Sequence, residues 1–384
     1  MKLIFLEYYK FLEPFFGRDK KKVFLLSNPK KNDLVVFDAK GIEILKKTLI
    51  YNLDFSIIYT REGKYYLSLE IAIRTIINKL LNGCGFGIAY YLSLVQIMKP
   101  KVLITFYSRN SMGLLSKYYK AEYYSIQNGF HLPRDISKSE AYYTPNLFCF
   151  GKYDIDLYKQ AGIEVDNFYS VGSLKAGYYK KNLAPKINNI KFDICLVSQY
   201  RPRIIESRSN HQEFKKAYDV MQKYLIQYLN NNQIRFVIAM ARYRKGESNL
   251  ERSYYENIYG NKAIMIKNNP EEFSTYFTMD QSDIVISLNS TAAFEALGWG
   301  KKTFIFSVSG SLDLTLNRTC SQHFVMCENS YQEFEKKIDG LRKMTSSKYS
   351  KLVYEDKSYF MNHDPAAPAH QVIREKINSA IYKN

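Results

Sequence analysis

Short apolar runs that end in Gly, Ser or Asn recur along the chain, and stretches with helical character separate them. This alternation is typical of parallel α/β sheets, in which each strand is followed by a helix. The first half of the chain contains five such runs. We predict strands there at residues 34–37, 55–59, 102–106, 122–126 and 147–150.

A long helix is predicted at residues 66–81, between the second and third of these strands. The glycine-rich stretch 83–87 ends it. This stretch resembles a phosphate-binding loop only superficially, because no Lys-Ser or Lys-Thr pair follows it. We therefore do not place a nucleotide there.

The second half of the chain starts a new α/β unit after a Lys- and Asn-rich stretch, residues 180–191, which is typical of an interdomain linker. A helix is predicted at residues 212–230 and another at 368–382. The predicted strands of this half are 192–197, 234–240, 264–267, 284–287 and 303–306.

Two successive units of this kind predict an α/β fold with two Rossmann-like domains and a cleft between them. The expected domains are residues 1–180 and residues 181–367. A C-terminal helix within residues 368–384 is expected to pack across both. With 384 residues, the chain is long enough to bury two cores.

The net charge of the chain indicates which classes of partner it can bind. Lysine and arginine number 55 against 37 acidic residues, and the net charge of +18 attracts phosphates, nucleic acids or an anionic membrane surface. The basic residues are dispersed along the chain and form no recognised base-reading motif, so we do not expect nucleic acid as a partner. Peripheral contact with an anionic membrane stays among the expectations.

The cysteines and the N-terminal segment bear on location. The five cysteines form no CxxC pair, which is typical of reduced thiols in a cytoplasmic protein. Residues 1–16 are apolar but carry Lys2, Glu7, Lys10 and Glu13, so they match neither a signal peptide nor a spanning helix. We expect a cytoplasmic protein that at most touches the inner face of the membrane.

The most informative stretch lies at residues 282–302. A buried strand runs into a small polar loop, Asn289, Ser290 and Thr291, and then into a helix. The N–H groups and the positive end of the dipole at such a helix start favour an anion. Ligands of open α/β sheets also gather at the carboxyl ends of the strands, so we predict a nucleotide phosphate at this loop.

Residues 283–306 resemble the donor-binding block of GT-B glycosyltransferases: a strand, a small polar loop, a helix with an internal Glu, then Gly and a basic residue before the next strand. Similar blocks occur in transferases that use CMP-activated ulosonic acids, such as Kdo and sialic acid, and in CDP-glycerol-type polymerases. The resemblance implies that Asn289, Ser290 and Thr291 hold the donor phosphate. It also implies that Glu295, one turn along the helix, reaches a ribose hydroxyl.

Purely structural interpretations of these residues exist. Asn289 or Ser290 could simply cap the helix without any ligand. Glu295 could pair with Lys301 or Lys302 instead of a ribose, since surface ion pairs are common.

In the first half, the segment Gln127-Asn128-Gly129 after a predicted strand resembles the Gln-X-Gly loop in the N-terminal domain of related surface-polysaccharide transferases. The resemblance implies that these three residues bind the acceptor. Some relatives carry an acidic general base in this loop, but an asparagine cannot take a proton. Three residues remain as candidates for the base: His131, Asp135 and Glu122. We favour His131, because an imidazole accepts a proton near neutral pH.

Cations and polar groups follow two strands of the second half. Ser198, Gln199 and Arg201 come after the first of these strands, and Arg242 comes after the second. Guanidinium groups bind phosphate or carboxylate oxygens with two hydrogen bonds, so these residues are predicted to bind the donor. Relatives that use CMP-linked donors often have a His-Pro pair near the second place, where this chain has Arg242. The segment 172–175 likewise resembles a part of these transferases that lines the cleft.

Metal and cofactor sites are not expected. The histidines show no metal-ligand spacing with one another or with the cysteines. The predicted reaction is therefore a metal-independent transfer, without a cofactor, from a nucleotide-sugar donor to a glycan or glycolipid acceptor. The resemblance favours a CMP-linked ulosonic acid as donor and lipopolysaccharide, capsule or a related bacterial surface glycan as acceptor. A sugar-nucleotide epimerase or hydrolase, a CDP-polyol phosphotransferase and a nucleic-acid-binding protein are the alternatives.

Overall fold

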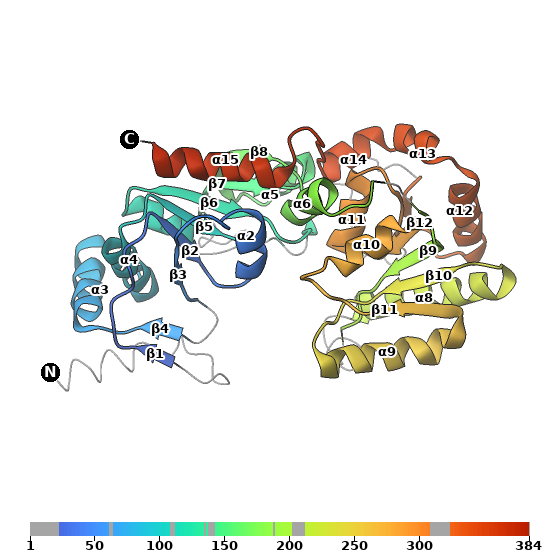
Figure 1. Ribbon diagram of the computed structural model, residues 1–384, viewed down its shortest axis with the longest axis horizontal. Coiled ribbons are helices and arrows are strands. Elements are labelled where there is room, and N and C mark those ends of the chain that lie inside the picture. Colours follow the sequence, from blue (N-terminus) through green and yellow to red (C-terminus); the bar gives the residue numbers. More distant parts are fainter. Residues whose placement is uncertain are drawn as a thin grey trace.

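The computed structural model describes residues 23–60, 64–107, 112–133, 136, 143–186, 189–201, 212–307 and 323–383. Within them the chain forms two six-stranded parallel sheets, which lie in two lobes side by side (Figure 1). The strand order is β3-β2-β5-β6-β7-β8 in the first sheet and β11-β10-β9-β12-β13-β14 in the second. A small parallel sheet pairs β1 with β4.

The first domain contains the following elements: β1 (Val23–Leu25), β2 (Leu34–Phe37), α2 (Ile42–Thr48), β3 (Ser56–Ile58), β4 (Lys64–Tyr66), α3 (Leu69–Asn82), α4 (Phe86–Met98), β5 (Val102–Thr105), the 3₁₀ helix η2 (Met112–Lys117), β6 (Glu122–Ile126), β7 (Tyr143–Cys149), α5 (Lys152–Gln160), β8 (Glu164–Ser170) and α6 (Leu174–Asn182). Helices cover both faces of its sheet. Val36 and Ile104 pack on the side of α15, whereas Val35 and Leu103 pack on the side of α4. This two-sided burial explains why the central strands are continuous apolar runs in the sequence.

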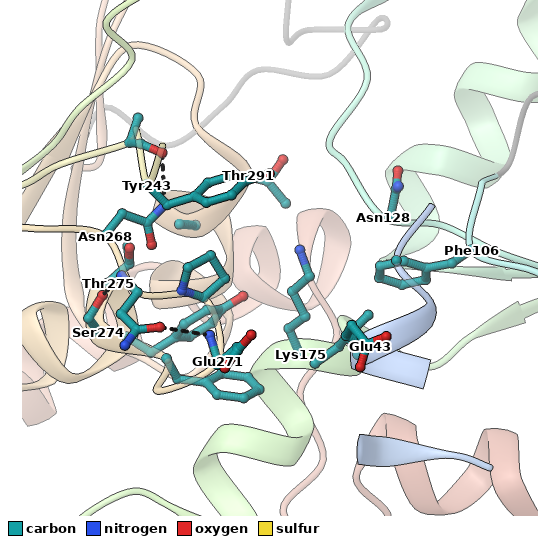
Figure 2. A pocket seen from close by; sticks show the side chains of 18 of the residues that line it. Glu43, Phe106, Asn128, Lys175, Tyr243, Asn268, Glu271, Ser274, Thr275 and Thr291 are labelled. Carbon is teal, nitrogen blue, oxygen red and sulfur yellow. Dashed lines mark hydrogen bonds between the residues drawn. The ribbon is translucent and has the colours of Figure 1, made fainter. Parts of the chain in front are cut away.

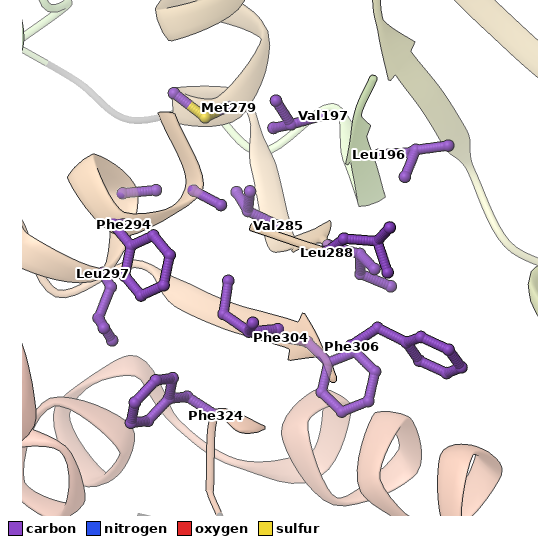
Figure 3. Packing of buried hydrophobic residues seen from close by; sticks show 14 of the residues in the cluster. Leu196, Val197, Met279, Val285, Leu288, Phe294, Leu297, Phe304, Phe306 and Phe324 are labelled. Atoms are coloured by element: carbon purple, nitrogen blue, oxygen red, sulfur yellow. The ribbon is translucent and has the colours of Figure 1, made fainter. Parts of the chain in front are cut away.

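The second domain contains the following elements: β9 (Phe192–Val197), α8 (Gln212–Asn231), β10 (Phe236–Ala239), α9 (Lys245–Tyr259), the 3₁₀ helix η4 (Gly260–Lys262), β11 (Ala263–Ile266), α10 (Ser274–Asp280), β12 (Ser282–Ser287), α11 (Thr291–Gly298), β13 (Lys302–Phe306), β14 (Val325–Met326), α12 (Tyr331–Lys343), α13 (Ser346–Leu352) and α14 (Tyr354–Phe360). In its core, Val285 and Phe304 of neighbouring strands pack with Phe294, Leu297 and Phe324 (Figure 3).

Most predicted elements lie within about two residues of where the sequence places them, but three boundaries differ by more. The helix predicted from residue 66 begins at Leu69, because Lys64–Tyr66 pairs with β1 and Ser68 then caps the helix. The predicted linker begins inside a helix, since α6 continues to Asn182. The strand predicted at 147–150 starts earlier, at Tyr143.

The chain crosses back to the first domain near its end. Helix α14 packs on both α11 of the second domain and α5 of the first. Helix α15 (Ala369–Tyr382) then lies along the first domain, where Ile373 and Ile377 join the core around β2 and β5 (Figure 1). The helix that packs across both domains is therefore α14, and the predicted C-terminal helix packs on the first domain because its apolar face completes that core.

No single helix in the described part of the chain is long and apolar enough to span a membrane. The pair α3 and α4 satisfies the length and composition test together, but the two helices are bent by 120° at their junction.

Candidate functional site

The strand order of the second sheet determines where a ligand can bind. The chain starts this sheet at β9, adds β10 and β11 on one side, and then returns to add β12 on the other. Loops that leave two such neighbouring strands diverge and open a crevice at the carboxyl end of the sheet. The crevice of this domain therefore lies between residues 198–201 and residues 288–291.

The first sheet has its own reversal, between β2 and β5. The loops after these strands contribute residues 39–41 and Phe106 to the same cleft as the crevice of the second domain. This cleft has a volume of about 2150 Å³. The two reversals of strand order thus face each other across one interdomain space, as the sequence predicts for two α/β units.

Gln199 connects the two loops of the second domain. Its Oε1 accepts hydrogen bonds from Ser287 Oγ (2.8 Å), Leu288 N (3.1 Å) and Asn289 N (3.0 Å). Its Nε2 donates to Asn289 Oδ1. The amide is therefore saturated by the protein, and Gln199, predicted to bind the donor, holds the β12 loop in place.

The predicted phosphate loop lines the cleft: Asn289, Ser290 and Thr291 all contribute to its wall. Ser290 is the N-cap residue of α11, but its side chain makes no capping hydrogen bond, so capping does not account for it. Thr291 Oγ1 accepts a hydrogen bond of 2.8 Å from Phe130 N in the first domain. The threonine thus bridges the domains, while Ser290 stays at the cleft surface.

Glu295 is buried at the base of the cleft, 4% exposed. It accepts hydrogen bonds from Ser173 Oγ and from Tyr276 Oη, the latter at 2.8 Å. Burial raises the pKa of this carboxyl, and these donors oppose the rise. Lys301 and Lys302, its alternative partners from the sequence, bond elsewhere.

Lys175 is a cleft residue that sequence analysis placed in a lining segment without giving it a role. It lies in the first turn of α6, and its side chain points into the space between Thr291 on one side and Asn128 on the other (Figure 2). Desolvation lowers the pKa of its ammonium group, and Glu295 opposes this shift. Within the described part of the chain, Nζ has no hydrogen-bond or salt-bridge partner; it lies 5.6 Å from the Phe106 ring centroid.

The two predicted arginines line the cleft but differ in their contacts. The Nε and Nη2 atoms of Arg242 donate to the carbonyl of Tyr200 at 2.9 and 2.7 Å. Arg201 is exposed and lies 5.7 Å from the centroid of the Phe214 ring. Arg242 is therefore held in one orientation, whereas Arg201 presents an exposed cation.

Glu251, which sequence analysis missed, organises this side of the cleft. The fully buried carboxylate comes from α9 and accepts hydrogen bonds from Ser198 Oγ, Ala241 N (2.8 Å) and Arg242 N (2.7 Å). Burial raises its pKa, and these donors oppose the rise. Ser198, which was predicted to bind the donor, therefore donates its hydroxyl hydrogen bond to Glu251. The same carboxylate holds the loop that carries Arg242 through the backbone N–H groups of Ala241 and Arg242.

The Gln-X-Gly loop of the first domain is held in a similar way. Gln127 is buried and donates from Nε2 to Asp154 Oδ1 (2.7 Å) and to the carbonyl of Gly129 (3.0 Å). Burial raises the pKa of Asp154 to about 6, and Phe150 N and Gly151 N also donate to it. The amide nitrogen of Gln127 therefore fixes the loop.

Among the predicted acceptor residues, Asn128 lines the cleft. The loop then crosses to the second domain: the Phe130 ring stacks on Phe294 with centroids 3.8 Å apart. A β-carbon at Gly129 would lie 3.9 Å from Thr291 Oγ1, an ordinary van der Waals contact, so this part of the loop packs closely against the second domain. The loop is therefore a contact between the domains at one end of the cleft.

The three candidates for the general base fare differently. His131 is buried and does not line the cleft, because Phe130 occupies the position between the domains and the chain turns inward after it. Glu122 is exposed at the amino end of β6, the edge of the sheet opposite to the cleft. Asp135 lies outside the described residues.

Helix α2 and the loop before α10 complete the cleft. Lys47 Nζ donates to the carbonyl of Glu271 (2.7 Å) across the cleft and lies 5.1 Å from the Phe273 ring centroid. Glu43 projects from α2 on the first-domain side (Figure 2). Among the described lining residues, it is the acidic side chain that the first domain contributes.

Metal-binding features are absent from the described residues: no group of three His, Cys, Asp or Glu could hold an ion there. The chain contains one Asp-X-Asp sequence, at residues 154–156. Both aspartates lie in α5 and neither lines the cleft. Asp154 bonds to Gln127, and Asp156 accepts a hydrogen bond of 3.0 Å from Tyr359.

Residues 125–365 match the model of a protein family described as "putative O-antigen biosynthesis protein". The match covers more than half of the 384 residues. It includes the loop after β6, Lys175 and both loops of the second crevice. No curated protein sequence matches the chain.

Solved structures with the same architecture have little sequence in common with this chain. A UDP-N-acetylglucosamine 2-epimerase-like protein from Listeria monocytogenes superposes with a TM-score of 0.52 and 11% identity, over 95% of this chain and 98% of that one. The UDP-GlcNAc 2-epimerase of Methanocaldococcus jannaschii, in complex with UDP-GlcNAc and UDP, gives 0.50 and 13%, over 93% and 99%. A variant of the wall teichoic acid polymerase TagF, soaked with CDPG, gives 0.50 and 12%, over 99% and 95%. Identities this low show the fold alone, and they confirm the predicted GT-B architecture.

Proposed function

The chain belongs to the family of putative O-antigen biosynthesis proteins, and on that premise we propose that it transfers a sugar from a nucleotide-activated donor to a surface glycan or glycolipid. One observation carries the proposal: the strand-order reversals of two parallel sheets face each other across a single cleft. Each reversal is a place where α/β proteins bind ligands, so two substrates can meet there.

The donor nucleotide is assigned to the second domain. Its phosphate lies at Ser290 and the first turn of α11, where N–H groups and the helix dipole favour an anion. Arg201 and Lys175 line the same cleft as this loop and supply positive charge to it. Preorganised charges of this kind stabilise the negative charge that develops on a leaving phosphate.

A CMP-linked ulosonic acid is the proposed donor. The sugar of such a donor carries a carboxylate in addition to the nucleotide phosphate. The cleft contains several basic side chains, which can bind both anionic groups. The sequence resemblance to CMP-dependent transferases supports this choice. The neighbours in this fold that were solved with CDPG and with UDP-GlcNAc and UDP make CDP- and UDP-linked donors the alternatives.

The acceptor hydroxyl is assigned to the first-domain side, near Asn128 and α2. It attacks the anomeric carbon as the bond from that carbon to the phosphate oxygen breaks, and its proton must go to a base. Glu43 is the described carboxylate of this domain in the cleft, so we assign it as the general base in place of His131. Lys175 stabilises the departing phosphate, and no metal ion takes part in the proposed step.

A thermal-shift screen over CMP, CDP, UDP and GDP tests the donor assignment, since a bound nucleotide raises the melting temperature by mass action. The largest shift is expected with CMP. A preference for UDP or GDP would overturn the ulosonic-acid donor, and the absence of any shift would contradict the nucleotide site.

Incubation of the preferred nucleotide sugar without acceptor separates transfer from epimerisation or hydrolysis. A transferase should convert little donor until a glycan acceptor is added. Complete conversion of the donor alone, followed by NMR of the sugar, would favour an epimerase or hydrolase of the same fold.

A further inference from the structure

Helix α3 is oriented against the usual rule for a surface helix. An amphipathic helix normally turns its apolar stripe to the core and its polar side to water. Here Thr75 and Asn78 share the buried side with Ile71 and Ala72. Five large apolar residues lie on the exposed side: Leu69, Ile73, Ile77, Leu80 and Leu81. The helix sits at the outer end of the first domain, away from the second domain (Figure 1).

The buried polar side is satisfied by specific contacts with α4. Asn78 Nδ2 donates to Ser93 Oγ (3.0 Å) and to Gln96 Oε1 (3.0 Å). Gln96 Nε2 donates back to Asn78 Oδ1 (3.1 Å), and Thr75 Oγ1 lies 3.3 Å from Ser93 Oγ. These bonds fix the rotation of α3, so the apolar residues cannot turn inward without leaving the amides unpaired.

The exposed side is a continuous apolar stripe. Its members recur at helical spacing along the whole length of α3, and their exposed fractions range from 46% to 80%: Leu69, Ile73, Ile77, Leu80 and Leu81. Leu26, which is 77% exposed, follows β1 next to the start of the helix, where Leu67 N donates to the Leu25 carbonyl. A contiguous apolar surface of this kind marks a place that is covered by something other than water.

The charge around the stripe is positive. Residues 23–31 and 64–83, which form and flank this end of the domain, contain five basic residues, Lys30, Lys31, Lys64, Arg74 and Lys79, against one acidic residue, Glu70. Arg74 pairs with Glu70, which leaves the lysines as the net charge. A second copy of the chain docked symmetrically would bring these lysines face to face, so an anionic partner fits better.

We propose that the exposed stripe of α3 lies in the interface of an anionic lipid bilayer, with Leu69, Ile73, Ile77, Leu80 and Leu81 among the acyl chains and the flanking lysines at the headgroups. A helix with an apolar face and basic flanks binds membranes in this way, parallel to the surface. The benefit of this contact, delivery of a lipid-linked acceptor to the cleft, rests on the proposed function; the contact itself does not.

Vesicle sedimentation tests the proposal with the full chain and no substrate. The wild-type protein should pellet with vesicles of phosphatidylcholine and phosphatidylglycerol, and less with phosphatidylcholine alone. A triple variant, Ile73→Gln, Ile77→Gln and Leu80→Gln, should lose binding by up to about a thousandfold, since each fully inserted aliphatic side chain contributes roughly a factor of ten. A control variant changes equally exposed residues of the second domain, Leu250→Gln, Ile264→Gln and Leu352→Gln, and should bind like the wild type.

Two further measurements keep the outcomes distinct. The melting temperature of the α3 variant and its shift on addition of nucleotide should equal those of the wild type, because α3 lies far from the cleft. If no nucleotide shifts the melting temperature but the wild type still binds vesicles, the membrane proposal stands without the nucleotide site. Equal pelleting of the α3 variant and the wild type would overturn it. So would a wild type that elutes as a dimer and ignores vesicles while the α3 variant elutes as a monomer.

Discussion

The two strand-order reversals that face each other across the cleft are built in different ways. In the second domain, Gln199 ties the β9 loop to the β12 loop, and Glu251 fixes the loop after β10 from below. In the first domain, the corresponding wall is formed largely by α2, whose side chains Glu43 and Lys46 are well exposed.

This difference suits the two proposed substrates, the donor on the second-domain side of the cleft and the acceptor on the first-domain side. A wall whose loops are bonded to each other keeps its dipoles and cations in place before the ligand arrives, which suits the invariant nucleotide phosphate of a donor. A wall of exposed side chains on a short helix adapts to varied hydroxyl groups, which suits a glycan acceptor. Lys175 stands where the two walls meet and so belongs to both.

The sharpest test of this division is Glu43→Gln. If the acceptor wall holds the base, this change should lower kcat by about 10²–10⁴, the usual contribution of general-base catalysis, and leave nucleotide binding unchanged. Steady-state kinetics and nucleotide thermal shifts measure the two effects. Glu271→Gln, on the second-domain side of the cleft, is the matched control and should retain activity. Equal losses in both variants would remove the base from α2.

Lys175→Met probes the junction of the walls. We expect kcat to fall by about 10²–10³, as for the loss of one preorganised charge. Stability should rise, because the variant removes an ammonium group whose pKa is lowered by desolvation. Between that lowered pKa and the ordinary lysine value, the unfolded chain binds a proton that the folded state does not, so wild-type stability should increase with pH there.

Denaturant titrations of wild type and Lys175→Met over a range of alkaline pH check the stability effect, and their difference should shrink as pH rises. Lys40→Met, at another cleft lysine, serves as the comparison for kinetics. A variant that is less stable than the wild type at neutral pH would show that Lys175 has a structural role instead.

Gln199→Leu tests whether the hydrogen bonds between the second-domain loops stabilise the nucleotide side of the cleft. The substitution leaves Ser287 Oγ and two backbone N–H groups without their acceptor, and should lower the free energy of unfolding by roughly 3 kcal/mol. Nucleotide affinity should fall with it. Chemical denaturation and calorimetric binding measure both. Gln127→Leu, at the matched amide of the first domain, should leave nucleotide affinity intact; an equal loss there would end the distinction between the walls.

The effect of Asp154→Asn appears only as a function of pH. The folded state holds this carboxyl proton up to about pH 6, whereas the unfolded chain releases it near pH 4. Between these values the folded state binds more protons, so wild-type stability should fall as pH rises, by up to about 3 kcal/mol. The variant should lack this slope in denaturant titrations. Parallel curves for the two proteins would show that Asp154 titrates normally.

The strands that the sequence predicted best are those covered on both faces. β2, β6 and β9 begin and end where their apolar runs do, because every residue of a central parallel strand meets a helix layer. The polar loop at Asn289–Thr291 was also predictable, since it directly follows such a strand. The burial of His131 was not predictable, because a histidine after a strand gives no information on which way the chain turns next.

Residues of helix interiors were not predictable in the same way. Glu251 in α9 and Asp154 in α5 read as ordinary solvent-facing acids, yet both are buried and hold loops. The amphipathic pattern of α3 predicts a helix but not which side is covered, and here Thr75 and Asn78 are buried while five large apolar residues stay exposed.

The sequence by itself determined most of the central strands, the two-domain α/β architecture and the polar loop before α11, because apolar periodicity and helix starts are local properties of the chain. Only the tertiary structure decided which loops the buried side chains hold in place by hydrogen bonds and which side chains face the cleft. Gln199 and Asn289 are 90 residues apart, and Ser198 and Glu251 are 53 apart. Such pairs have no local signal, because their energy comes from burial and hydrogen bonds that exist only after the sheets have formed.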